Sequence, residues 1–355
     1  MTYFRLILRF LAAQQLLPAW AATEAATEQE ALIGGQAVFE GVMMRSPHAW
    51  GIAVRKAAVP EGSKELGEIV VHSEPLHRPS DKHHWMAWPF IRGLVTLGQA
   101  MKLGFRASKF SINIMVAALT PEKKQSDKMP EMSKWTTAIT MIFSIGFFIV
   151  MYKLVPLTAT QGLASHLPLL SNNILFNLVD GIIRLTLFVL LIWGLSLMPD
   201  MRRLFEYHGA EHKTVFAYEA QRDIPNVEFT QKFSTYHPRC GTSFLMTIML
   251  ISIVIYAAVP VAAAAPGAHF FGKAFWLRFG IRILLLPVIA SISYEMIRFS
   301  AQHGKSLFAL MTRPGLWLQR ITTKQPADDQ VECAIKALDE AMILEKKNGG
   351  ELVIA

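Results

Sequence analysis

The sequence predicts a polytopic α-helical membrane protein with about four transmembrane helices, a small N-terminal β element and cytoplasmic amphipathic helices. Of the 355 residues, 52% are hydrophobic and only 17% are charged, and the mean hydropathy is +0.32. This composition is too apolar for an ordinary soluble enzyme of the same length. The apolar residues also come in long blocks instead of alternating with polar ones, which is typical of membrane spans.

The formal net charge of +8 indicates what the protein contacts. The Lys and Arg residues cluster beside the apolar blocks, which is where anionic lipid headgroups and cytoplasmic loops favour them. We therefore expect the lipid bilayer as a partner and no nucleic acid, while homo-oligomerisation and the substrate stay open. Cys240 and Cys333 are too few for a disulfide framework, so the soluble parts are expected to face a reducing compartment.

Residues 1–32 are expected to form a variable N-terminal extension. A basic start and a small-residue exit resemble a secretory signal peptide. Arg9 splits the apolar stretch, however, and Gln14 and Gln15 interrupt it. An amphipathic surface helix or a variable extension is therefore favoured over a cleaved signal.

Residues 33–80 are predicted to form a small β-containing cytoplasmic element. Residues 50–55 and 68–72 alternate or run apolar like short strands, with a turn-rich loop between them. Glu40 and Arg45 are the polar residues of interest in the run before the first strand. Taken singly, each is better explained as part of a surface ion pair flanking a hairpin.

Residues 86–119 are predicted to form an interfacial or re-entrant amphipathic helix. Lys102, Arg106 and Lys109 recur at helical spacing, so one face of this helix is basic. Such a helix lies in the membrane interface, and a more deeply seated helix with snorkelling cations is the second interpretation.

Four apolar blocks are each long enough, at about 20 residues, to cross a bilayer: residues 135–155, 174–197, 242–264 and 274–297. Together they define a transmembrane core over residues 135–297. Every basic flank falls on the same side of the membrane if all four blocks cross. This pattern predicts a multi-pass protein of the cell inner membrane with both termini, and the loop over residues 198–241, in the cytoplasm.

Residues 298–355 are predicted to form a cytoplasmic C-terminal helical tail. Within it, Val331, Ile335, Leu338 and Met342 recur at helical spacing. We expect an amphipathic helix that packs on the cytoplasmic domain.

The loop over residues 198–241 contains most of the candidate metal-binding residues. In a helix, His208, Glu211 and His212 lie at i, i+3 and i+4 and share one face. The order His-x-x-Glu-His is also that of inverted zinc peptidases, and His237 and Cys240 follow after one short loop. Imidazole and thiolate suit Zn²⁺ or another divalent transition metal. The competing interpretation is two helix-end histidines and a buried thiol without a metal.

The ligand set has two open points. Four ligands from His208, His212, His237 and Cys240 would close a tetrahedral zinc site, whereas catalysis needs an open position. Glu295, near the cytoplasmic end of the fourth block, is the candidate to replace His237 or Cys240, or it pairs with Arg298 one turn on. Glu211 is the candidate general base, taking a proton from metal-bound water.

Three motifs carry a family resemblance: GGQAVFEGVMMRSP at residues 34–47, YHGAEHKT at residues 207–214 and HPRCGTSF at residues 237–244. The sequence resembles the YqhQ-like family of uncharacterised bacterial membrane proteins, described as predicted metal-dependent enzymes. The likeness runs from about residue 33 to about residue 345. It implies a polytopic inner-membrane protein with a metal site, and these signature polar residues: Glu40, Arg45, His208, Glu211, His212, His237, Arg239 and Cys240.

Three functions are therefore weighed. The leading hypothesis is a membrane-integral metal-dependent enzyme, a hydrolase acting at the cytoplasmic membrane surface. The second is a non-catalytic membrane scaffold or assembly factor with a structural zinc site. The third is a transporter or lipid-handling protein, motivated by Arg184, Arg278 and Arg282 within or near the apolar blocks. The absence of a visible internal repeat disfavours a secondary transporter.

Overall fold

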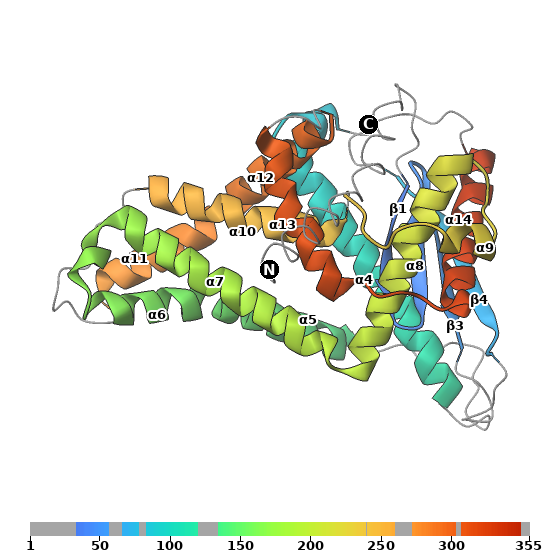
Figure 1. Ribbon diagram of the computed structural model, residues 1–355, viewed down its shortest axis with the longest axis horizontal. Coiled ribbons are helices and arrows are strands. Elements are labelled where there is room, and N and C mark those ends of the chain that lie inside the picture. Colours follow the sequence, from blue (N-terminus) through green and yellow to red (C-terminus); the bar gives the residue numbers. More distant parts are fainter. Residues whose placement is uncertain are drawn as a thin grey trace, which may run out of the picture.

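The computed structural model of the chain is mostly helical, with one small antiparallel sheet (Figure 1). It describes residues 33–56, 66–77, 83–119, 134–238, 240–259, 272–302 and 307–348. The predicted extension over residues 1–32 lies outside this range. In Figure 1 the sheet lies at one end of an elongated molecule, and the long apolar helices extend away from it.

The predicted β element is confirmed as a four-stranded meander with the order β1-β2-β3-β4. The strands are β1 (Gly34–Val38), β2 (Gly41–Arg45), β3 (Ala49–Arg55) and β4 (Ile69–Pro75), and all neighbours are antiparallel. A two-residue turn joins β1 to β2, and Glu40 adopts a left-handed φ of 53° there. Tight hairpins need this backbone conformation because it matches the twist of the strands.

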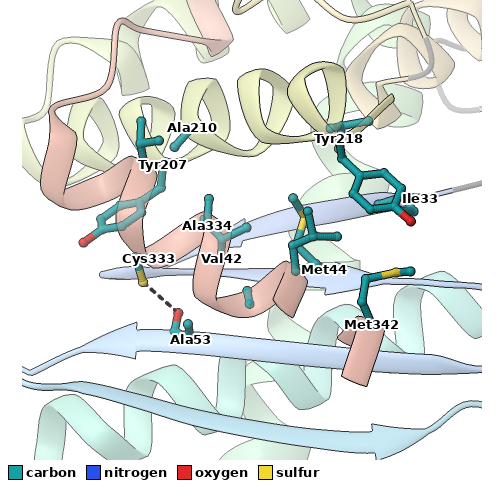
Figure 2. Close-up of a cluster of buried hydrophobic side chains, with 14 residues drawn as sticks. Ile33, Val42, Met44, Ala53, Tyr207, Ala210, Tyr218, Cys333, Ala334 and Met342 are labelled. Atoms are coloured by element: carbon teal, nitrogen blue, oxygen red, sulfur yellow. Dashed lines mark hydrogen bonds between the residues drawn. The ribbon is translucent and has the colours of Figure 1, made fainter. Parts of the chain in front are cut away.

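Helices cover both faces of the sheet. Val42 and Ala53, which pair across β2 and β3, pack with α8 (Pro199–Gln221) and α14 (Asp328–Asn348) (Figure 2). Their neighbours Met43 and Ile52 point the other way, onto α4 (Ile91–Leu119). Successive side chains of a strand point to opposite faces. Because both faces are buried, β2 and β3 are apolar except for their last residues, Arg45 and Arg55, and do not alternate.

The C-terminal helix α14 confirms the predicted amphipathic helix. Val331 and Leu338 are fully buried, Met342 is buried, and Ile335 packs at the edge of the same core. The helix lies so close to β3 that a Cβ on Gly51 would stand 2.6 Å from the Ala337 carbonyl oxygen. Only glycine allows that approach of a helix backbone to a strand.

The helix α4 packs on the sheet through Leu103, Ala107 and Ile114. Of the three cations predicted to form its basic face, Arg106 binds Glu74 on β4 and lies 5.5 Å above the Trp50 ring. Part of the basic face therefore interacts with the sheet. A position of this helix in the membrane interface stays a prediction.

The remaining helices and turns have these bounds: η3 (His84–Ala87), α5 (Lys134–Ile149), the π-helix η5 (Val150–Leu154), α6 (Val155–Ala164), η6 (Pro168–Ser171), α7 (Asn173–Ser196), α9 (Val227–Gln231), α10 (Gly241–Ala258), α11 (Lys273–Leu284), α12 (Leu286–Gln302) and α13 (Leu307–Thr322). Within the described residues, three helical runs are long and apolar enough to cross a membrane: Ile142–Ala164, Asn173–Ser196 and Gly241–Ala258. The pair α11 and α12 adds a fourth if it is counted as one bent span.

Two predicted blocks differ in detail from these helices. The first helical run continues beyond residue 155 to Ala164. The π-helical turn η5 directly precedes Pro156, and the helix continues past this proline without a break. The last block is broken by a 41° bend between α11 and α12. Pro287 stands at the start of α12, where its missing N–H and its ring disrupt the continuing helix. The predicted block over residues 274–297 therefore corresponds to two helices joined by a bend.

Candidate metal centre

The helix α8 presents two functional faces. Tyr207, Ala210 and Tyr218 point into the core formed with the sheet and α14 (Figure 2). His208 and His212 instead contact the segment before α10 and the end of α13. The candidate centre thus lies where the sheet layer meets the apolar helices.

Three of the predicted ligands come together. The ligand atoms of His208, His212 and Cys240 all lie within 4.8 Å of one another. His208 Nε2 is 3.2 Å from Cys240 Sγ. Cys240 occupies the N-cap of α10, so the first turn of a candidate span holds the thiol in place. The i, i+4 spacing on α8 accounts for the two imidazoles, and chain folding supplies the sulfur.

Backbone carbonyls orient both imidazoles. His208 Nδ1 lies 2.8 Å from the Thr322 carbonyl oxygen, and His212 Nδ1 lies 2.5 Å from that of Thr235. A carbonyl oxygen only accepts, so each Nδ1 carries the proton and donates it. The lone pair of each neutral ring is then on Nε2, which is the arrangement found in metal-binding histidines. His212 Nε2 is buried and has no hydrogen-bond partner among the described residues.

His237 lies beside this group without belonging to it. Its ring centroid is 5.5 Å from that of His212 and 4.5 Å from that of Phe216. Gln319 holds its backbone on both sides, accepting from the N–H and donating to the carbonyl, each at 2.8 Å. Burial, assisted by the neighbouring rings of His212 and His208, lowers the pKa of His237 to about 3. The His237 imidazole is therefore neutral near pH 7.

Glu211 lies on the sheet side of α8 and is not part of the group formed by His208, His212 and Cys240, which differs from the single face expected for the three residues of the motif. Its carboxylate accepts the backbone N–H of Gly35 on β1, and burial raises its pKa against the opposing effects of His208, that N–H and Arg45. A Cβ on Gly35 would stand 2.9 Å from Glu211 Cγ and 2.5 Å from the Met43 carbonyl oxygen. The glycine-rich start of β1 thus gives the Glu211 side chain its space.

Glu40 also contacts α8. From the β1–β2 turn its carboxylate binds the Arg203 guanidinium through both oxygens and accepts from the Tyr207 hydroxyl at 3.3 Å. Glu40 thus pairs with Arg203 of α8, and the charge of Arg45 acts on Glu211 of the same helix. Together they connect the first motif to the helix that carries the histidines.

Glu295 has a different neighbourhood. Its carboxylate binds the Arg92 guanidinium through both oxygens and accepts from the backbone N–H of Phe90 at 3.2 Å. Arg92 neutralises the negative charge of the Glu295 carboxylate, which a metal ion would need. Glu295 is also not part of the group formed by His208, His212 and Cys240. The structure does not bring this predicted ligand to the centre. Arg239 lies outside the described residues.

The comparison with known proteins gives the family. Residues 88–343, more than half of the chain, match the family described as "Protein of unknown function (DUF1385)". The chain belongs to this DUF1385 family. It is also 31% identical over 318 residues to "Uncharacterized protein YqhQ" of Bacillus subtilis (strain 168), an alignment covering 88% of this chain and 92% of that protein. The resemblance to the YqhQ-like family is thereby confirmed. No solved structure matches the chain.

The DUF1385 match includes all five predicted ligands, while strands β1 to β4 precede it in the chain. Three supporting residues of the centre were missed by sequence reasoning: Thr235, Gln319 and Thr322. Thr235 and Thr322 act through their backbone carbonyls, which any residue could supply. Gln319 belongs to α13, within a stretch predicted only as helical tail. No local sequence signal marks these three positions.

Proposed function

We propose that the protein is a membrane-integral metal-dependent enzyme, a hydrolase whose centre is built from His208, His212 and Cys240. The observation that carries the proposal is their convergence: three ligand atoms lie within 4.8 Å, and both Nδ1 atoms are tied to backbone carbonyls. Two imidazole nitrogens and one thiolate suit zinc or a similar transition ion. Three protein ligands are the number found in catalytic zinc sites, where a fourth position stays open.

The chemistry of the bound ion follows from this donor set. A zinc ion held by these three side chains would act as a Lewis acid and lower the pKa of water, as hydrolysis requires. The orphaned, buried His212 Nε2 is the structural feature that fits such an ion. A buried nitrogen lone pair without a partner is unfavourable, and a metal ion removes that cost.

Glu211 is the proposed proton acceptor. It is adjacent in sequence to His212, it is buried, and its carboxylate is held by the Gly35 N–H. Burial raises its pKa toward the range in which a carboxylate exchanges protons efficiently near neutral pH. His237 stays neutral and packs against His212, so its proposed role is to position that ring.

The proposed location is the cell inner membrane, with both termini in the cytoplasm. The first helical run supports it, because Ile142 and Phe143 are 72% and 73% exposed on a long apolar helix. Side chains of this kind are stable in lipid and unfavourable in water. Arg202 and Arg203 lie in the first turns of α8, shortly after α7 ends, which supports a cytoplasmic position for the start of α8. The centre would then lie at the cytoplasmic membrane surface.

Metal analysis of the purified protein tests the centre. We expect about one zinc or similar ion per chain. His208→Ala, His212→Ala and Cys240→Ser should each lose most of it, whereas His166→Ala, at an exposed histidine, should keep it. Undiminished metal in the His208→Ala/His212→Ala double variant would refute the proposed ligands.

A closed, structural zinc site is the second candidate, favoured by His237 lying beside His212. In that case the protein is a scaffold, and Cys240→Ser unfolds the segment around α9 while Glu211→Gln is nearly silent. The enzyme hypothesis expects Glu211→Gln to keep the metal and melting temperature but to lose about 10²–10⁴-fold in rate, read as lost complementation in cells. Glu228→Gln, at an exposed carboxylate, is the matched control. Full complementation by Glu211→Gln would contradict the hydrolase.

A further inference from the structure

A second cluster of buried charged side chains lies at the opposite end of α10 from the metal centre. Tyr256 is in the last turn of this helix, and Cys240 caps its first turn. At 1.5 Å per residue the two positions are about 24 Å apart. The second cluster is therefore independent of the metal ligands.

Positive charge exceeds negative charge in this cluster. Arg184 and Arg282 both bind the single carboxylate of Asp180, and all three side chains are buried. Buried Lys153 donates to the Tyr256 hydroxyl at 2.9 Å. Among the described residues, Asp180 is the one acidic group that the structure brings to these cations. Arginine keeps its proton in proteins, so the excess does not depend on Lys153 alone.

Aromatic rings offset only part of this charge. Lys153, Arg184 and Arg282 all lie over the Tyr256 ring, at 5.1, 5.2 and 5.2 Å from its centroid. Cation–π contacts are attractive, but a ring carries no net charge. The cations around Tyr256 therefore still repel one another inside an apolar helix bundle.

A small cavity opens beside the excess charge. Its lining includes Arg278, Arg282, Tyr256, Asn173 and Asn177, together with the apolar residues Val259 and Ile281. Arg278 lies over the Phe176 ring, 4.2 Å from its centroid. A planar guanidinium offers parallel N–H donors that match two oxygens of a phosphate group. Tyr256, both asparagine amides and two N–H groups of Arg282 already donate to protein acceptors. The lining thus offers net positive charge, and the Arg278 guanidinium is the group that would hold a tetrahedral oxyanion.

We propose that this cavity binds a phosphate group, carried either by an anionic membrane lipid or by free inorganic phosphate. An anion here offsets the excess charge of the arginines and adds charge-assisted hydrogen bonds to their guanidinium groups. The site goes beyond the proposed hydrolase centre and does not depend on it. Loss of the metal should leave phosphate binding intact.

The test uses full-length protein treated with a chelator, so that the metal centre cannot contribute. One arm titrates inorganic phosphate against chloride at constant ionic strength in detergent. The other compares nanodiscs of phosphatidylcholine with nanodiscs that also contain phosphatidylglycerol. The readout is the melting temperature of the wild type, of Arg278→Gln and of the matched control Lys273→Gln. Lys273 is an exposed cation on the same helix and is not part of the cavity.

We expect the wild type and Lys273→Gln to be stabilised equally by the ligand, and Arg278→Gln to bind it about ten- to a hundred-fold more weakly. A response to inorganic phosphate identifies free phosphate, and a response to phosphatidylglycerol alone identifies a lipid headgroup. No response in either arm overturns the proposal, as does an equal response in Arg278→Gln.

A purely structural role of Arg278, which packs over the Phe176 ring, would lower the melting temperature of Arg278→Gln without ligand. The ligand response of each variant is therefore measured as the shift from its own ligand-free melting temperature. If Arg278→Gln fails to fold, Arg278→Lys keeps the charge but loses the planar fork. It should then show weakened but measurable phosphate stabilisation, and undiminished stabilisation would refute recognition by the guanidinium group.

Discussion

Gly209, inside the His-x-x-Glu-His segment, is expected to decide how well the two histidines are oriented. A Cβ built at this position would stand only 2.0 Å from the Lys324 carbonyl oxygen and 3.3 Å from Thr235 Cγ2. These contacts belong to the chain segments whose carbonyls hold His208 and His212. Alanine at Gly209 must therefore displace both segments, because a backbone carbonyl cannot rotate away like a flexible side chain.

The magnitude follows from two opposing effects. Alanine is favoured over glycine within a helix by about 0.8–1.0 kcal/mol. Forcing a methyl group into a packed site typically costs about 1–3 kcal/mol, and a contact against backbone lies at the upper end. We expect Gly209→Ala to lower the free energy of unfolding by about 1–2 kcal/mol. Loss of the carbonyl partners should also weaken metal binding by about 10- to 100-fold.

The assay combines thermal unfolding of detergent-solubilised protein with a competitive metal-binding titration. Gly98→Ala is the matched control, since Gly98 lies within α4 and a Cβ there meets no atom within 4 Å. Gly98→Ala should be neutral or slightly stabilising and should leave metal affinity unchanged. The packing argument fails if Gly209→Ala matches Gly98→Ala in both measurements.

Three further predictions follow from the described contacts. Burial raises the pKa of Glu345, but hydrogen bonds from the β2–β3 turn, two of them from His48, outweigh it and lower that pKa. The ionised carboxylate stabilises the fold above the unfolded value of about 4.3 and loses this effect as pH falls through the lower folded value, so the melting-temperature advantage over Glu345→Gln should shrink with acid. Leu338→Ala should cost about 2–5 kcal/mol of stability because Leu338 is fully buried, whereas Ile343→Ala on the exposed side of α14 should be nearly silent in the same thermal melt. A compartment-sensitive reporter fused at residue 222 or at the C-terminus should report cytoplasm, and a periplasmic signal from residue 222 would refute the topology.

Much of the fold could be predicted because its signals are local. Apolar blocks of sufficient length, the short strands of the β element and the spacing of Val331 and Leu338 each depend on neighbouring residues. The covering of the sheet on both faces could not be predicted in this way. It brings α4 and α14, which are more than two hundred residues apart in sequence, onto opposite faces of β3. The bend between α11 and α12 could have been predicted, since Pro287 is visible in the sequence.

The ligand set shows the same division. The i, i+4 spacing of His208 and His212 is a property of one helix, so it could be predicted directly. Choosing among His237, Cys240 and Glu295 required knowing which side chains already had partners. Arg92 binds Glu295 from a segment about two hundred residues away, and no pattern near either residue indicates that pairing.

The two faces of α8 link the residues of the three motifs. One face meets β1, where Gly35 gives Glu211 its space and donates its N–H to the carboxylate. The other face presents the imidazoles to Cys240 at the start of a candidate span. A shift of α8 on the sheet would therefore move Glu211 and both histidines as one body. Strand β1, helix α8 and the first turn of α10 are thus coupled. Through these contacts the sheet sets the position of the centre relative to the apolar helices.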